Sequence, residues 1–278
     1  MGWKILGRCL AAAFLLAGSS ALCGAAVAPR STAKVEMKEK AEAPPSREGF
    51  RDVIATLLKD PAFLDKNNAF EKGTRMHRLF ESFMREILSD SAVVDFLFTS
   101  VKDNADHVTD FEAFGKALAG EYALRGLTRL SEEDFQELLR VLGVLAEKLP
   151  AGDCAGMLRP GNAFDYHWLE LLPEEDAKTY LRLSKKALVA EITKSPRIAA
   201  NSQEQTKVAN QALVAELRRR LPAEKLRLFG KIWEKPELAG DNELCWGFQV
   251  LITSILDLPT ESRRWMVREY ANLLRPPK

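Results

Sequence analysis

Histidines and acidic residues are the first places to look for chemistry in this chain, because they form most metal sites and carry out acid–base catalysis. The chain has three histidines, His77, His107 and His167. None has a second histidine or a cysteine at the spacing of a zinc site. Asp103 opens an Asp-Asn-Ala-Asp run, but an EF-hand loop needs Gly at its sixth position and Glu at its twelfth, where the chain has Val108 and Phe114. We therefore predict no metal site and no cofactor.

Motifs for nucleophilic catalysis and phosphate binding are also missing. The sequence contains no G-x-S-x-G, no G-x-x-x-x-G-K-[ST] and no G-x-G-x-x-G. Ser31 and Lys34 have Ser-x-x-Lys spacing, but their segment lacks the apolar residues that would keep a lysine desolvated. Glu81 falls off the apolar stripe of its predicted helix, so we expect it to face water. A catalytic site would have to be assembled from scattered Asp, Glu and His residues.

One short segment combines aromatic and titratable side chains after a Pro-Gly turn. Its members are Phe164, Asp165, Tyr166, His167 and Trp168. Tyr and Trp offer a large contact area with a polar group, so the segment is a candidate interaction surface. A structural interpretation stays open, because Phe164, Trp168 and Leu171 have helical spacing and could pack inside the protein.

The cysteines suggest a disulfide. Two of the four lie in the first 28 residues, and the other two are Cys154 and Cys245. In an oxidising compartment this pair is a candidate disulfide, and closing so long a loop would stabilise the fold by about 4 kcal/mol. The alternative is that Cys245, beside Leu244 and Trp246, is a small buried apolar residue.

The N-terminus has the composition of an export signal. Lys4 and Arg8 precede an uncharged stretch, residues 9–28, that is rich in Ala and Leu and ends in small residues. We predict a signal peptide over residues 1–28 and a periplasmic or secreted protein; an uncleaved membrane anchor is the alternative. Residues 29–49 carry Ala, Lys, Glu and Pro without an apolar stripe, which predicts a flexible linker.

An internal repeat with an offset of 42 residues organises the middle of the chain. Residues 127–140 and 169–182 share two leucines, a helix start followed by three acidic residues, and a buried stripe. Ser131 is the expected N-cap of the first copy, and Pro173 is expected in the first turn of the second. Fainter Leu-Pro-x-Glu helix starts follow at residues 221–224 and 258–261.

Apolar residues at helical spacing continue from residue 50 to the C-terminus, which predicts an all-α domain over residues 50–278. A repeat near 40 residues is typical of an α-solenoid of stacked helical pairs, and a multi-helix bundle is the alternative. A subdivision is possible near residues 103–109, and residues 195–205 are a second seam. The apolar run 92–101 predicts a helix at the centre of an N-terminal core, with an exposed partner-binding face as the alternative.

The charge balance excludes a strongly basic protein. The 278 residues include 40 Lys and Arg and 39 Asp and Glu, so the formal net charge is +1. A nucleic-acid-binding protein would normally show a basic face, so we predict no nucleic-acid partner. The densest basic run, residues 218–220, is expected to be a solvated helix end.

These observations predict a non-catalytic, exported helical module that binds another envelope or secreted protein, as an inhibitor, chaperone or assembly component. Contact with a membrane is expected only if residues 1–28 are retained. The alternative is a cell-envelope hydrolase whose carboxylate and histidine residues leave no linear motif. A concave pocket containing two carboxylates, or a carboxylate and a histidine, would favour the hydrolase.

Overall fold

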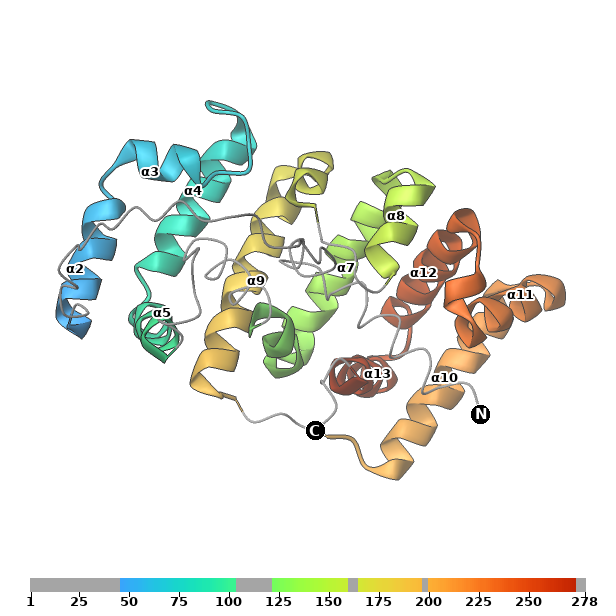
Figure 1. Cartoon of the computed structure of the whole chain (residues 1–278). Helices are drawn as coiled ribbons and strands as arrows, with labels where there is room; N and C mark the ends of the chain where they lie inside the picture. The colour runs from blue at the N-terminus through green and yellow to red at the C-terminus, as the bar shows by residue number, and fades with distance from the viewer. Residues whose placement is uncertain (1–45, 104–121, 160–164, 197–199, 274–278) are drawn as a thin grey trace, which may run out of the picture.

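The computed structural model describes residues 46–103, 122–159, 165–196 and 200–273. Within these ranges the protein is entirely helical and contains no strand, as predicted (Figure 1). The predicted signal peptide and nearly all of the predicted linker lie outside the described residues. None of the described helices has both the length and the hydropathy needed to cross a bilayer.

Four helices form an N-terminal layer, which we define as residues 46–103. They are α2 (Arg47–Leu57), α3 (Pro61–Lys66), α4 (Arg75–Leu88) and α5 (Ser91–Asp103). Ser46, Asp60 and Thr74 act as N-caps, each accepting a backbone N–H of the following turn. Because α2 already begins at Arg47, the last three residues of the predicted linker are helical.

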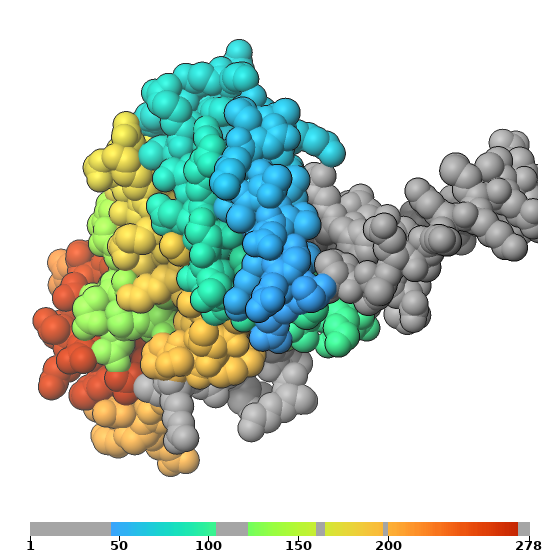
Figure 2. Space-filling model, turned by 90° about the vertical axis from the view of Figure 1, so that its left-hand side faces the viewer, coloured from blue at the N-terminus to red at the C-terminus, as the bar shows by residue number. Residues whose placement is uncertain are grey.

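Helix α5 contains the apolar run, and its position differs from the prediction. Only Val93 and Val94 of this helix are buried, and its remaining apolar side chains are half-buried. Asp95 interrupts the run and faces α2, where Arg51 Nη2 lies 2.7 Å from both carboxylate oxygens. Helix α5 therefore lies between α2 and α9 near one side of the molecule, and not at the centre of a core (Figures 1 and 2).

The two copies of the repeat have the same local structure. Each begins with a 3-10 helix, η1 (Leu127–Arg129) or η2 (Tyr166–Leu171), and continues into a long helix, α7 (Glu132–Lys148) or α9 (Glu174–Thr193). The N–H of Leu130 donates to the carbonyl of Leu127, and in the second copy Leu172 donates to Leu169, at 3.3 and 3.1 Å. The shared leucines thus form the same hydrogen-bonded turn before each of the two helices.

The helix starts differ in their caps. The Ser131 hydroxyl accepts the N–H of Asp134, as predicted. Pro173, however, is itself the N-cap residue, with φ −52° and ψ 150°, one position earlier than expected. Proline suits this position because an N-cap residue is extended and its own N–H is not needed by the helix. Pro150 and Pro222 cap the following helices, α8 (Ala151–Leu158) and α11 (Ala223–Glu234), in the same way.

The helices are not arranged in chain order. Helix α9 lies between the N-terminal layer and α7, and it contacts α4, α5 and α7 (Figure 1). On its other side α7 packs against α12 (Asp241–Leu256) and α13 (Thr260–Leu273). Helix α12 also contacts α8, α11 and α10 (Gln203–Arg220), and η3 (Pro236–Leu238) joins α11 to α12. A solenoid would stack successive pairs in sequence, whereas here the second copy turns back toward the N-terminus.

The main core lies among α7, α8, α9 and α12. Leu139, Leu145 and Phe248 are completely buried there. Cys154 on α8 and Cys245 on α12 form a disulfide within this core, with their Cα atoms 5.6 Å apart. We define residues 122–273 as the helical body, which contains this core and the repeat.

Candidate functional site

The predicted interaction segment is divided between the surface and the interior. Phe164 lies outside the described residues. Asp165 is exposed and is the N-cap of η2, accepting the N–H of His167 at 2.9 Å. His167 is exposed too, and the edge of its ring meets Phe70 with centroids 5.5 Å apart. These two side chains are therefore available at the surface.

The other two residues of the segment are turned toward the interior, and Tyr166 joins the helical body to the N-terminal layer. The ring of Tyr166 packs edge-on against Phe80 of α4, at 5.4 Å between centroids. Burial raises the pKa of the Tyr166 hydroxyl. Trp168 is half-buried and packs against the main core. This part of the segment follows the structural interpretation, because its aromatic area is used inside the protein.

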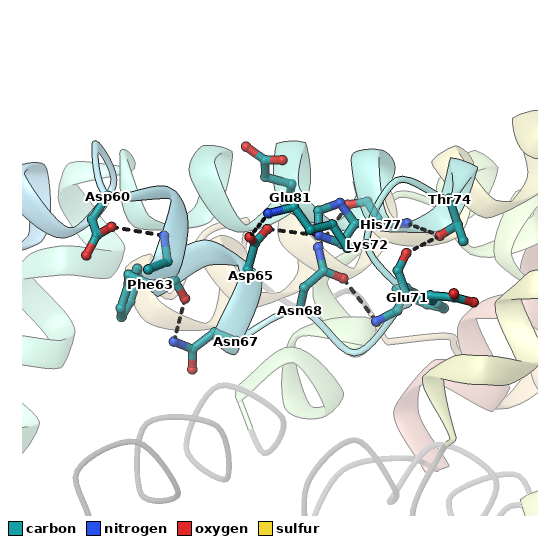
Figure 3. A network of polar contacts seen from close by, with 12 residues as sticks. Asp60, Phe63, Asp65, Asn67, Asn68, Glu71, Lys72, Thr74, His77 and Glu81 are labelled. Atoms are coloured by element: carbon teal, nitrogen blue, oxygen red, sulfur yellow. Dashed lines mark hydrogen bonds and ion pairs between the residues drawn. The ribbon is translucent and has the colours of Figure 1, made fainter.

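A carboxylate and a histidine do come together in the N-terminal layer (Figure 3). His77 Nε2 lies 3.2 Å from one oxygen of Asp65, and Lys72 Nζ lies 2.5 Å from the other. The hydrogen bond from Lys72 is the main reason that the pKa of Asp65 is lowered. His77 is buried, and its Nε2 approaches Asp65 without making a hydrogen bond, whereas the other oxygen of Asp65 accepts a hydrogen bond from Lys72.

The same network shapes the turn between α3 and α4. The Asn68 side chain donates to the carbonyl of His77 at 2.9 Å, and its oxygen accepts the N–H of Phe70 at 3.1 Å (Figure 3). Phe70 is thereby held between Phe80 and His167. Asn68 thus positions an aromatic side chain against η2 by bridging the His77 carbonyl and the Phe70 N–H.

A long open groove runs along α10. Its volume is about 930 Å³, and it is lined by Ala200, Asn201, Gln203, Thr206, Lys207, Asn210, Gln211, Val214, Ala215, Arg218 and Glu269. The lining residues on α10 repeat every three or four positions, so they form one continuous face of the helix. We call this surface the α10 groove. An adjacent face of α10 carries the buried residues Ala209, Leu213 and Leu217.

Hydrogen bonds fix one end of the α10 groove. Glu269 on α13 accepts a hydrogen bond from the Thr206 hydroxyl at 3.0 Å and a longer one from the Asn201 amide at 3.4 Å. The same Asn201 amide donates to the carbonyl of Trp265 at 2.7 Å. The carboxylate of Glu269 is therefore already engaged by polar partners.

The remaining polar groups of the α10 groove are available. Among the described residues, the side chains of Gln203, Asn210 and Gln211 have no hydrogen-bond partner. Arg218 is exposed and forms no ion pair within the described ranges, whereas its neighbours Arg219 and Arg220 both bind Glu216. The groove thus presents unpaired amides and a free guanidinium to solvent.

A smaller cavity of about 230 Å³ lies at the start of α7 and is lined by Arg129, Glu132 and Arg268 among others. Three of its four charged lining residues form ion pairs between helices, and the fourth is Glu133. Glu132 binds both Arg264 and Arg268 of α13, and Arg129 Nε lies 2.6 Å from Glu191 of α9. We interpret this cavity as a joint between helices.

The two cavities contain neither Asp65 nor His77. Within the described part of the chain, no group of three or more His, Cys, Asp or Glu residues could hold a metal ion. Comparison of the chain with protein-family models, curated proteins and solved structures finds no match.

The α10 groove was not predicted from the sequence. Val208, Ala212 and Leu213 predict a helix that ends at the arginine run, and of these three residues only Leu213 is buried. The available signal was the recurrence of amide, Lys and Arg side chains at helical spacing from Gln203 to Arg218. That pattern indicates a polar helix face, and only its position beside α13 makes it a groove.

Proposed function

We propose that the protein is an exported helical module that binds another envelope or secreted protein and carries out no chemistry of its own. The observation that supports this proposal is the α10 groove, a cavity of about 930 Å³ with unpaired amide groups and a free arginine. Its size lies near the upper limit of ordinary ligand sites. Polar groups held ready on a rigid helix are suited to recognising another chain.

The make-up of the α10 groove favours binding over hydrolysis. Acid–base hydrolysis needs two carboxylates, or a carboxylate and a histidine, near one substrate atom. The groove contains one carboxylate, Glu269, which is engaged by Thr206 and Asn201. The Asp65–His77 pair lines neither cavity. A cell-envelope hydrolase therefore remains the second candidate.

Location outside the cytosol is part of the proposal. It is supported by the signal-like residues 1–28 and by the disulfide between Cys154 and Cys245, since disulfides persist in oxidising compartments. We propose that residues 29–45 connect the signal to the helical domain. A fusion of residues 1–28 to a reporter enzyme that is active only after export tests this point, and a reporter that stays inactive contradicts it.

Affinity capture tests the binding function. The purified protein is immobilised and exposed to an envelope extract of its source organism, and a captured protein is then purified and titrated calorimetrically. We expect one saturable partner with a defined stoichiometry. Recovery of no partner, together with turnover on a panel of cell-wall and lipid substrates, would reverse the ranking of the two candidate functions.

The exposed residues of the predicted interaction segment are tested in the same assay. If Asp165 and His167 belong to the binding surface, the double substitution Asp165→Asn with His167→Gln weakens the titrated complex. Replacing the N-cap Asp165 by Asn retains its capping ability, so the fold is preserved. An unchanged dissociation constant would remove this segment from the interface and leave the α10 groove.

A further inference from the structure

We infer that the α10 groove binds an extended polypeptide segment with acidic side chains. This inference rests on the proposed binding function and names the ligand class of its site. Three features carry it: the length of the groove, the chemistry of its lining, and an arginine that has no ion-pair partner among the described residues.

The length of the groove matches a short extended peptide. From Gln203 to Arg218 the helix rises about 22 Å at 1.5 Å per residue. An extended chain covers that distance with about six or seven residues. Groove residues one turn apart are about 6 Å from each other, close to the spacing of alternate residues in an extended chain. Successive turns of α10 can therefore meet successive backbone groups on one edge of the peptide.

The lining suits backbone recognition. The amide of Asn or Gln offers a donor and an acceptor side by side, which complements the N–H and C=O of a peptide. Asn210 and Gln211 lie in the middle of the groove, and Gln203 lies at one end. An α-helix uses its own backbone groups internally and binds in grooves with apolar walls. Eight of the eleven lining side chains are polar or charged, so an extended ligand, whose backbone groups are free, finds hydrogen-bonding partners along the groove.

Charge selects acidic side chains in that ligand. Glu269 keeps its negative charge, but it contacts Asn201 and Thr206 at the other end of the groove from Arg218. Lys207 lies 3.9 Å from Glu204 at an exposed site. Arg218 forms no ion pair with any described residue. An Asp or Glu of the ligand can make a two-pronged contact with this guanidinium. A basic segment, such as residues 274–278 with Arg275 and Lys278, lacks this complementarity.

The test is selection from a phage-displayed library of random linear dodecapeptides on the purified protein. Selected peptides are synthesised, labelled with fluorescein and titrated by fluorescence anisotropy. We expect enrichment of peptides containing Asp or Glu. We also expect methylation of alternate backbone nitrogens to weaken binding strongly and methylation of the intervening ones to weaken it little, because one edge of an extended strand faces the groove.

Three variants locate the site. Arg218→Glu should weaken the selected peptides at least about tenfold, because it replaces attraction by repulsion. Asn210→Leu with Gln211→Met keeps the side-chain size but removes both amides, and it should also weaken binding severalfold. Arg227→Glu is the matched control: Arg227 is exposed on α11 outside the groove, so the same charge change should leave affinity unchanged. Circular dichroism verifies that all variants melt cooperatively.

Failure of this inference can be told apart from failure of the proposed function. If the library yields no enriched peptide, the groove assignment is wrong. It is also wrong if the selected peptides bind Arg218→Glu and the amide variant as tightly as they bind the unaltered protein. A partner captured equally well by Arg218→Glu and by the unaltered protein would also overturn it, while leaving the binding function intact. Insensitivity to backbone methylation would contradict an extended ligand.

Discussion

The N-terminal layer and the helical body are both built from amphipathic helices, but different interactions hold them together. In the body, completely buried side chains such as Leu139 and Phe248 surround a disulfide. In the layer, α2 has no buried residue and is joined to α5 by the Arg51–Asp95 ion pair and a Phe50–Phe98 contact. Apolar burial stabilises far more than exposed ion pairs do. We therefore expect the layer to open locally before the body unfolds.

The joint between the two regions combines the packing of α4 and α5 against α9 with an aromatic cluster. Phe80 of the layer contacts Tyr166 of the body, and Phe70 contacts His167. Figure 2 shows the same succession, with α2 on the outer side of the layer and α9 behind it. Hydrogen exchange should consequently be fastest in α2 and slowest in α7 and α12. Uniform protection across both regions would contradict this comparison.

Reduction of the disulfide should have the largest effect, and it should act on the body. The bond joins residues 91 positions apart, so its loss costs about 4.5 kcal/mol by the chain-entropy estimate. The double variant Cys154→Ser with Cys245→Ser should lower the melting temperature of the body by well over ten degrees. Calorimetry with and without a reductant measures this change. Equal melting curves for the reduced and oxidised protein would contradict the prediction.

Gly126→Ala should have the next largest effect. A Cβ atom at this position would lie 1.8 Å from the carbonyl oxygen of Ala187 on α9, so backbone must shift. We expect a loss of about 3 kcal/mol, at the upper end for overpacking. Gly230→Ala is the matched control, because nothing lies within 4 Å of its added Cβ and alanine favours a helix. Urea denaturation should show opposite signs for the two variants.

Phe80→Leu should weaken the contact between the N-terminal layer and the helical body while leaving the core of the body intact. The side chain stays apolar, but its edge-on contacts with Phe70 and Tyr166 are lost, at a cost of about 1.5 kcal/mol. We expect faster hydrogen exchange in α4 and α5 with little change in α12. If exchange accelerates equally in α12, the layer and the body unfold as one unit and the comparison fails.

Acid should weaken the body through carboxylates that bridge its helices. Burial by itself would raise the pKa of Glu132, but hydrogen bonds from Arg268 and Arg264 outweigh it and lower the pKa. Burial would likewise raise the pKa of Asp134, but hydrogen bonds from Lys186 and Ser131 outweigh it and lower the pKa. A lowered pKa means that the unfolded state binds protons first as pH falls. Stability is therefore complete above about pH 5 and is lost as pH falls through the folded pKa values.

The variant Glu132→Gln tests this pH dependence. It should lower the melting temperature at pH 7 by a few degrees and flatten the decline between pH 5 and pH 3, because the residue no longer titrates. Melting temperatures across that range, for the variant and the unaltered protein, measure the effect. Parallel curves for the two proteins would show that Glu132 contributes nothing to the acid sensitivity.

The sequence predicted the helices well where the pattern was local. The stripe from Phe135 to Leu149 is buried as expected, and Ser131 caps its helix. The prediction for residues 92–101 was correct in type and wrong in place, because apolar composition does not specify how many neighbours cover a helix. Among the candidate surface residues, Tyr166 is turned inward by Phe80, a residue 86 positions earlier in the chain. No local pattern contains that information.

By itself, the sequence determined the all-helical class, the two similar helix starts and their caps, because these depend on hydrogen bonds within a few residues. Tertiary structure alone decided that α9 turns back between α5 and α7, that Asp65 meets His77 in a structural turn, and that the free face of α10 borders α13 to form a groove. The physical reason is that periodicity specifies which face of a helix is apolar. Which helix covers that face is set by packing among segments far apart in the chain.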